Sequence, residues 1–522
     1  MSELYPLPAG WCWSSLAELL TGIETGKSFK CEERPPTANE IGVIKVSAVT
    51  WGEFQALESK TCTDPERINP ALFVQRGDFL FSRANTIELV GACVIAKQVT
   101  LRTMLSDKIL RFRFRTDAMK IWALHLLRSK QGRQQIEALS SGNQDSMRNI
   151  GQERIGLIQV PVPPAAEQER VVAKLEDLLS DLDAGVAELK AAQQKLQRYR
   201  QSLLKAAVEG TLTAEWRKKN PPTETGAELL QRILRERRAR WEEQQLAKFA
   251  AQGKAPPKDW KDKYPEPQPP KTEGLPALPE GWVWASLEQL SHFARNGLST
   301  TPNTEGVGLP LLKINAVRPM SVNIAAIKHL EAREQDVADY FVEPGDLLVT
   351  RYNGSLDLLG VFGLVRDENS RVLHPDKLIR VKPVLVSTLG PWIEIAANTG
   401  NSRAHIVSRV KTTAGQTGIS GDDLKKMPVP LPPLREQDWG VAMFHDALAG
   451  LARQLDAIDH TLAQSSAQRQ NILRAAFRGE LVPQDPNDEP ASVLLERLRA
   501  ERSTTAKPTK AEHKTRKAAR VA

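Results

Sequence analysis

The chain has 522 residues, of which 41% are hydrophobic and 26% charged, and its formal net charge is +8. A chain of this length holds several domains that each bury a core. No run approaches the apolar length of a membrane span, and the N-terminus shows no signal-peptide pattern, so we expect a cytoplasmic protein with no membrane association.

The charge distribution and the cysteines further limit the classes of protein to which the chain can belong. The last twenty residues contribute +5 of the net charge, which leaves about +3 for the rest. Any specific contact with nucleic acid must therefore come from local patches and not from bulk charge. The four cysteines are widely spaced and form no CxxC pair, which is typical of reduced cysteines and not of a disulfide or zinc framework. They are Cys12, Cys31, Cys62 and Cys93.

A first globular domain is predicted over residues 1–160. It opens with Leu7-Pro8-Ala9-Gly10-Trp11. Short apolar runs bounded by Gly, Pro or Asp are typical of strands, and a helical run follows them at 119–139. The strand-like runs are 41–49, 77–85 and 107–111.

A long helix is predicted from Pro163 to Gly210. Prolines at its first turn and a glycine just past its last turn are typical helix boundaries. Its leucines recur at alternating three- and four-residue steps, a heptad pattern that buries against another helix. The pairing residues are Leu175, Leu178, Leu182, Leu189, Leu196 and Leu203, with Gly185, Ala192, Tyr199 and Ala206 in the same stripe. A charged helix at about 227–250 completes a segment at 161–252.

The whole pattern then repeats. After a linker at 253–274 rich in proline and lysine, a second domain at 275–430 opens with Leu278-Pro279-Glu280-Gly281-Trp282. The second long helix runs from Pro432 to Gly479, and its offset from the first helix is the same at both ends. Its seam weakens after Leu462, where Ser465 and Gln468 intrude. The seam residues are Leu448, Leu451, Leu455, Ile458 and Leu462. Residues 431–502 hold this helix and a short one, and 503–522 form a basic tail that we expect to be disordered.

The most suggestive polar residues follow the two Gly-Asp strands. Arg83 and Asn85 recur as Arg351 and Asn353. Arginine can read guanine and asparagine adenine in the DNA major groove. The alternative is a structural role, which is favoured because two readers of different bases should differ at these positions. Lys45 and Lys313 leave a similar choice between a phosphate contact and a solvated strand face.

Patterns for catalysis are weak. Gly22-Ile23-Glu24-Thr25-Gly26-Lys27-Ser28 has one residue too few between its glycines for a P-loop. Asn220-Pro221-Pro222-Thr223 lacks the aromatic residue that adenine methyltransferases stack on a flipped base, and a turn is the better interpretation. The eight histidines form no metal-binding pattern, so we predict no metal site and no catalytic residues.

The order and duplication of these motifs resemble the specificity (S) subunits of type I restriction–modification systems. The resemblance covers about residues 7–502. It rests on the Leu-Pro-x-Gly-Trp opening, the Gly-Asp strand followed by Arg, the Val-Pro-x-Pro-Pro-x-x-Glu-Gln approach to a long helix, and the Ala-Ala-x-x-Gly exit, each present twice.

This resemblance implies mixed α/β target-recognition domains in two copies, joined by two long antiparallel coiled-coil helices with a pseudo-two-fold repeat. Each domain would read half of a split double-stranded DNA sequence. Two methyltransferase (M) subunits and restriction/translocation (R) subunits would assemble on the chain. S-adenosylmethionine, ATP and magnesium would belong to those partners, with no cofactor in this chain and no catalysis by it. Two rivals stay open: a fused DNA-modifying enzyme, and a coiled-coil scaffold without DNA specificity.

Overall fold

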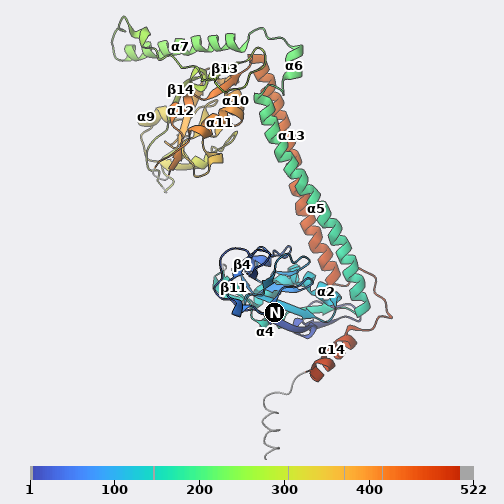
Figure 1. Ribbon diagram of the computed structural model, residues 1–522. Helices are drawn as coiled ribbons and strands as arrows, with labels where there is room; N and C mark the ends of the chain where they lie inside the picture. Colours follow the sequence, from blue (N-terminus) through green and yellow to red (C-terminus); the bar gives the residue numbers. More distant parts are fainter. Residues whose placement is uncertain (1–3, 145–146, 304, 369–370, 414–415, 506–522) are drawn as a thin grey trace, which may run out of the picture. The chain divides into compact units, whose positions relative to one another are not determined.

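The structure, a computed structural model, describes residues 4–144, 147–303, 305–368, 371–413 and 416–505 (Figure 1). The chain divides into two compact units. Unit 1 comprises residues 1–190 and 459–522, and unit 2 comprises residues 191–458. Both division points fall inside long helices, so each unit contains part of each helix. The basic tail predicted at 503–522 lies outside the described residues from position 506 on.

The central sheet of unit 1 occurs again in unit 2. Each is a four-stranded antiparallel sheet with the same strand order. In unit 1 the strands are β2 (Leu20–Thr25), β9 (Ile109–Phe114), β5 (Phe79–Ser82) and β7 (Cys93–Ile95). In unit 2 they are β14 (Ser291–Asn296), β21 (Leu378–Pro383), β19 (Leu347–Thr350) and β20 (Phe362–Leu364). The predicted internal repeat of mixed α/β domains is confirmed.

Two helices follow the central sheet in each unit. The helical run predicted at 119–139 divides into two helices because the Ser129 side chain accepts a hydrogen bond from Gly132 N and starts a new helix there. The helices are α2 (Asp117–Arg128) and α3 (Lys130–Leu139) in unit 1, and α10 (Val386–Ala397) and α11 (Gly400–Arg409) in unit 2. Short helices α4 (Gln152–Gly156) and α12 (Gly421–Lys425) come next.

The strand predicted at 41–49 is shorter than expected, and its counterpart in unit 2 is equally short. Each ends before a lysine, Lys45 or Lys313, and a 3₁₀ turn follows. The strands are β3 (Ile41–Ile44) and β15 (Leu309–Leu312). The strands beside them differ between the units. In unit 1, β3 lies between β4 (Ser59–Cys62) and β8 (Thr103–Met104). In unit 2, β15 pairs with β18 (Ile327–Leu330), and β16 (Val317–Arg318) forms a separate hairpin with β17 (Ser321–Val322).

The start of each domain is paired with the strand that leads into its long helix. In unit 1, β1 (Cys12–Ser15) runs antiparallel to β12 (Gln159–Val162). In unit 2, β13 (Val283–Ser286) pairs in the same way with β24 (Pro428–Leu431). Short helices α1 (Leu16–Leu19) and α8 (Leu287–Leu290) follow the first strand of each pair. The Leu-Pro-x-Gly-Trp and Val-Pro-x-Pro-Pro motifs are therefore two sides of one joint.

A tryptophan–glutamate hydrogen bond closes this joint in both units. The Trp11 indole donates to Glu167 at 2.9 Å, and the Trp282 indole donates to Glu436 at 3.0 Å. The second oxygen of Glu436 also accepts from the Thr213 hydroxyl and, at 2.9 Å, from Arg217. The second oxygen of Glu167 is buried and has no hydrogen-bond partner among the described residues.

This difference predicts opposite effects of one substitution. Burial raises the pKa of Glu167 despite the Trp11 hydrogen bond. The folded state then keeps a proton that the unfolded chain has released, so stability falls as pH rises above the carboxyl's ordinary pKa. Glu167→Gln should remove that fall and leave unit 1 at neutral pH as stable or up to about 1 kcal/mol more stable.

Glu436→Gln provides the matched comparison, since it deprives the Arg217 guanidinium of its carboxylate. We expect unit 2 to lose about 1.5–3 kcal/mol at neutral pH. Thermal unfolding of both variants from about pH 4 to about pH 8 measures the difference. Equal losses in the two variants would contradict this account of the joint.

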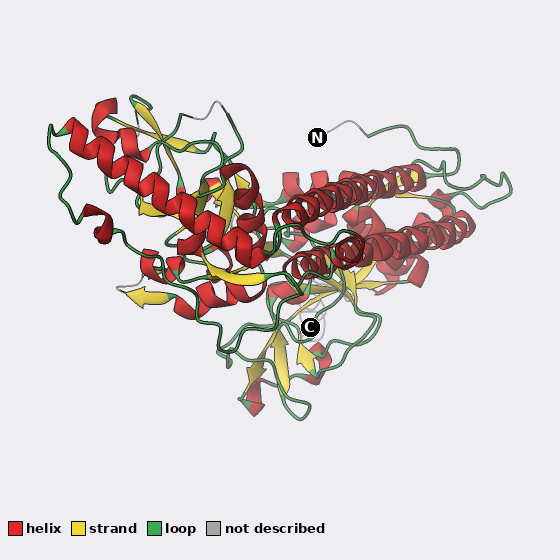
Figure 2. Ribbon diagram, turned by 90° about the horizontal axis from the view of Figure 1, so that it is seen from above, coloured by secondary structure: helices red, strands yellow, loops and turns green. Residues whose placement is uncertain are grey.

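The two long helices are α5 (Ala165–Val208) and α13 (Leu434–Phe477), each of 44 residues. They lie side by side in both views (Figures 1 and 2). They are antiparallel, because the start of α5 packs with the end of α13 in unit 1 and the reverse occurs in unit 2. Gly210 and Gly479 follow the helices with φ of 71° and 69°, the left-handed conformation that ends a helix.

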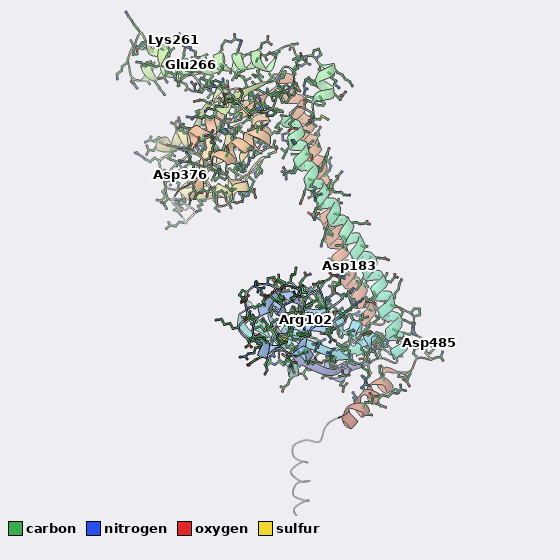
Figure 3. The ribbon with its side chains drawn as sticks, in the orientation of Figure 1. Arg102, Asp183, Lys261, Glu266, Asp376 and Asp485 are labelled. Atoms are coloured by element: carbon green, nitrogen blue, oxygen red, sulfur yellow. The ribbon has the colours of Figure 1, made fainter. Side chains whose placement is uncertain are left out.

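Burial along the predicted seam is uneven. Leu175, Leu203 and Leu451 are buried, whereas the other eight predicted pairing residues are half-buried. These eight are Leu178, Leu182, Leu189, Leu196, Leu448, Leu455, Ile458 and Leu462. Placing Tyr199 in the stripe was wrong, since it is 54% exposed, and the buried Leu179 was missed. Where the second seam becomes polar, Arg469 forms an ion pair with Asp183, which Figure 3 labels.

The segment that follows each long helix packs on the unit in which that helix ends. In unit 2 these are α6 (Ala214–Lys219) and α7 (Gly226–Ala251), and in unit 1 it is α14 (Ala491–Thr505). Gly226 N donates to Gly281 O at 2.7 Å, and Ala491 N donates to Gly10 O at 2.8 Å. The C-terminal segment thus attaches to the start of the first domain, as the middle segment does to the second.

The composition of the linker at 253–274 predicts an exposed segment, but the linker is not wholly exposed. Trp260 and Tyr264 are buried, and Trp260 stacks on Trp241 of α7. Arg237 of α7 donates to the Tyr264 hydroxyl at 2.6 Å. The linker is therefore held against α7 by aromatic contacts that its proline and lysine content does not reveal.

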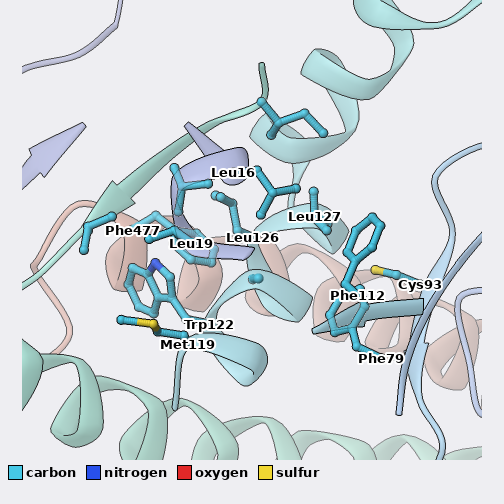
Figure 4. Close-up of a cluster of buried hydrophobic side chains, with 14 of the residues drawn as sticks. Leu16, Leu19, Phe79, Cys93, Phe112, Met119, Trp122, Leu126, Leu127 and Phe477 are labelled. Atoms are coloured by element: carbon cyan, nitrogen blue, oxygen red, sulfur yellow. The ribbon is translucent and has the colours of Figure 1, made fainter. Parts of the chain in front are cut away.

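The core of unit 1 combines residues from distant parts of the chain. Trp122 of α2 and Phe477 of α13 meet edge to face, 4.8 Å between ring centroids (Figure 4). Leu16, Leu126 and the strand residue Phe112 belong to the same buried cluster. The end of the second long helix therefore completes the core of the first domain.

Candidate nucleic-acid interface

A polar hairpin stands beside the Arg-Asn strand in each unit. In unit 1, β10 (Ser141–Gln144) and β11 (Met147–Asn149) form a sheet with β6 (Ala84–Asn85). In unit 2, β22 (Lys411–Thr413) pairs with β23 (Gln416–Gly418), and Tyr352 bridges to Gly418. Ser141, Gly142, Met147 and Asn149 are exposed in the first hairpin, and Lys411 and Thr412 in the second.

Matching backbone hydrogen bonds fix the two arginines between this hairpin and the central sheet. Arg83 N donates to Lys108 O at 2.9 Å, and Arg83 O accepts from Ile150 N at 2.9 Å. Arg351 N donates to Lys377 O at 2.9 Å, and Arg351 O accepts from Ile419 N at 3.0 Å. Lys108 and Lys377 are exposed and directly precede β9 and β21. Each site therefore combines an arginine with a lysine from the neighbouring strand.

The two arginine side chains differ in their freedom. Among the described residues, no hydrogen bond or ion pair engages the half-buried Arg83 guanidinium. Arg351 lies over the Tyr352 ring at 4.8 Å and makes one long hydrogen bond, 3.5 Å, to Asp376 O. Its buried Nε has no partner among the described residues. Both arginines retain donors for an acceptor outside the chain.

The asparagines have a local role that the arginines lack. The Asn85 side-chain oxygen accepts from Thr86 N at 2.9 Å, and that of Asn353 accepts from Ser355 N at 3.1 Å. Paired recognition of adenine needs both the oxygen and the NH₂ of an asparagine. Because the oxygen already shapes the turn, the structural interpretation suits both asparagines better than base reading.

Lys45 and Lys313 lie elsewhere in the two units. Each is half-buried at the start of a 3₁₀ turn, and its backbone N–H is bonded to Glu58 O or Ala326 O. Neither strand that precedes these lysines shares a sheet with the hairpins. The six predicted residues therefore fall at two places in each unit, and the hairpin groups only the arginine and asparagine of each set.

The aspartate of each Gly-Asp motif forms a buried ion pair with an arginine, Arg111 in unit 1 and Arg380 in unit 2. Asp78 and Arg111 are 4% and 1% exposed, and their side chains are 2.9 Å apart. Asp346 and Arg380 repeat the pair at 2.6 Å. Gly77 and Gly345 precede the aspartates with φ of 88° and 84°, which favours glycine. These motifs hold the central sheet together, and each aspartate precedes the strand that the arginine of the candidate site follows.

The hairpins themselves were not singled out in the sequence. Both occur just before an isoleucine, Ile150 or Ile419, and these isoleucines have the same offset as the two long helices. Short runs rich in Ser, Thr, Asn, Gln and Gly before each isoleucine are the signal that was available. Arg148 closes the first hairpin by donating to Gly142 O at 2.8 Å, whereas Thr412 and Thr417 meet across the second at 3.2 Å. One framework thus carries different side chains in the two units.

The two segments that partly match nucleotide-binding and methyltransferase motifs lie in a strand and in a loop. Gly22–Thr25 lie within β2, and 220–223 form a loop in unit 2. Across the described ranges, no group of three or more His, Cys, Asp or Glu side chains is arranged to hold a metal ion. Within the same ranges no helix combines the length and apolar character that a membrane crossing requires.

Comparisons with known proteins place this architecture. No family model matches the chain. It is 32% identical over 390 residues to the type I restriction enzyme EcoKI specificity subunit of Escherichia coli (strain K12), covering 73% of this chain and 71% of that protein. It is 26% identical over 389 residues to the StySPI specificity subunit of Salmonella potsdam, with the same coverage.

A solved structure shares the fold. The solved protein comes from a structure described as the structural basis of complex assembly and conformational transition of the type I R-M system. It aligns with 91% of this chain and 100% of its own length, with a TM-score of 0.55 and 19% identity.

Proposed function

Since this chain belongs to the family of type I restriction enzyme specificity subunits, we propose that it recognises a bipartite DNA target, one part through each unit. The observation that carries the proposal is the repeated framework with a divergent polar hairpin. The same backbone bonds present Arg83 beside one hairpin and Arg351 beside the other, while the hairpin side chains differ. Two equivalent frames with different surfaces suit the reading of two different half-sites.

The same proposal assigns catalysis to other subunits. The two methyltransferase subunits and the restriction subunits assemble on this chain, and S-adenosylmethionine, ATP and magnesium bind to them. The exposed faces of α5 and α13 provide surface for such assembly, since exposed positions recur along most of the length of both helices. The chain itself supplies DNA recognition and a scaffold.

Exchange of one recognition domain tests the proposal. Residues 16–158 are replaced by the matching segment of another specificity subunit, which leaves β1, β12 and the Trp11–Glu167 bond in place. We expect one half of the methylated sequence to change and the other half to persist. Sequencing of methylated adenines in cells carrying the complex gives the readout.

Exchange of residues 287–427 is the reciprocal control and should alter only the other half-site. If a single exchange altered both halves of the methylated sequence, the proposal that each unit reads one half would be contradicted. Methylation by the purified chain without partner subunits would contradict the assignment of catalysis.

The arginines beside the hairpins provide a finer test. Arg83→Ala should weaken DNA binding by the assembled complex by about 1–3 kcal/mol and relax discrimination within one half-site. Arg351→Ala should do the same in the other half-site. Arg102→Ala removes an equal charge next to β8, away from the hairpin, and Figure 3 labels this residue.

Binding to target DNA and to targets with single substitutions is measured at several salt concentrations. Uniform weakening with a smaller salt slope would indicate a phosphate contact in place of base reading. Equal effects of Arg83→Ala and Arg102→Ala would contradict a specific role for the hairpin site.

A further inference from the structure

The repeat breaks at one position near the start of the long helices. Trp439 of α13 occupies the place that Arg170 has in α5, since both stand six residues after the second proline of the Pro-Pro pair. In unit 1, Arg170 pairs with Asp488 at 2.6 Å. In unit 2, Trp439 instead stacks on Trp216 of α6, with ring centroids 5.5 Å apart and an angle of 21° between the rings. A self-contained ion pair in one unit is thus an aromatic pair in the other.

A pocket of about 380 Å³ lies beside this aromatic pair, entirely within unit 2. Trp216, Pro221, Pro222 and Pro433 give it an apolar surface. Both tryptophans are only half-buried, although tryptophan gains much from complete burial. The volume is at the lower end of the range for ligand pockets and accommodates one or two side chains of a partner.

The rim of the pocket carries unused positive charge. Lys219 and Arg435 are exposed, and no hydrogen bond or ion pair among the described residues engages either side chain. The acidic lining residues are already satisfied: Glu436 accepts from Arg217 at 2.9 Å, and Glu224 pairs with Arg232 at 2.8 Å. The pocket therefore combines an apolar part of its lining with two free cations.

We propose that this pocket receives a polypeptide segment of one methyltransferase subunit, in which an apolar side chain is flanked by Asp or Glu. The inference rests on the proposed function, which supplies that partner. Trp and Arg are enriched where partner side chains anchor in pockets. The buried Glu436 carboxylate and the half-buried Glu224 carboxylate in the lining disfavour a phosphate backbone, and the small volume suits a side chain and not a duplex. Unit 1 has the Arg170–Asp488 pair at this point, so the contact exists on one side of the scaffold only.

The test is assembly of the full chain carrying Lys219→Glu and Arg435→Glu with its cognate methyltransferase subunit. Both residues are exposed, so the variant should melt as the wild type does. Native mass spectrometry across a titration follows the first and second bound copies separately. We expect one copy to bind about tenfold more weakly and the other to be unaffected. In the wild type, these charges should make the binding of that one copy weaken with added salt, and they should not affect the binding of the other copy.

The matched control is Ala166→Glu, which places a negative charge in unit 1 at the position equivalent to Arg435. It should leave both affinities unchanged. A second variant, Trp439→Arg, tests the apolar contact and should weaken the same copy as the charge reversal.

If both the charge-reversal variant and Trp439→Arg bound two methyltransferase subunits with wild-type affinity, the inference would be overturned and the proposed function would remain intact. Normal assembly with weakened DNA binding would also overturn it, because the cations would then serve nucleic acid. A wild-type chain that binds no methyltransferase subunit would contradict the proposed function and this inference together.

Discussion

Arg380→Ala is expected to lower the free energy of unfolding of unit 2 by about 3–5 kcal/mol, the cost of removing one partner from a buried ion pair. Arg380 is 5% exposed and Asp346 is fully buried. The guanidinium donates to the Asp346 carboxylate at 2.6 Å and also to Phe341 O. Without it, Lys382 at 3.6 Å is the nearest remaining cation to Asp346.

The loss should depend on pH in a defined direction. Burial raises the pKa of Asp346 against the attraction of Arg380. Removing the arginine raises that pKa further, so the folded variant binds a proton that the unfolded chain has released. Its stability therefore falls as pH rises above the ordinary carboxyl range, and part of the loss is recovered on acidification.

Hydrogen exchange of peptides from β19 and β21, compared with that of unit 1 peptides, isolates the effect in a two-unit chain. Asp346→Asn combined with Arg380→Met removes both charges and should cost less than Arg380→Ala alone. Arg111→Ala is the counterpart in unit 1, where Arg113 remains 3.0 Å from Asp78, so its cost should be smaller. An unchanged exchange rate in β21 of Arg380→Ala would contradict the structural role of this pair.

The second large effect is expected for Phe477→Ala, which should destabilise unit 1 by about 3–5 kcal/mol. Phe477 is 2% exposed, packs against Trp122, and its carbonyl accepts from the Tyr5 hydroxyl at 2.7 Å. The substitution opens a cavity between α13 and α2. Although it is made close to the C-terminus, it should increase hydrogen exchange in α2 and β12 of the first domain.

Val208→Ala is the matched control, since Val208 lies at the equivalent position at the end of α5 in unit 2. Loss of two methyl groups there should cost on the order of 1–2 kcal/mol and affect unit 2 instead. If Phe477→Ala left α2 unchanged, the end of the second helix would not complete the first domain's core.

The sequence by itself determined the features that depend on local pattern. Helix periodicity and boundary residues placed the long helices within a few residues of α5 and α13. The repeated motifs, with an offset that is the same at both ends of the long helices, established the duplication, and the order of the motifs indicated the family. Gly77 and Gly345 could be recognised as turn residues because their requirement is conformational and local.

Only the tertiary structure decided which residues meet. Asp78 and Arg111 are separated by 33 positions, and Trp122 and Phe477 by far more, so no local pattern reports either contact. The uneven seam has the same origin: Leu175 and Leu179 are buried because a domain packs on that end of α5, whereas Tyr199 faces outward where no described element covers it. Heptad spacing specifies a helix face, and burial depends on what the rest of the chain places against that face.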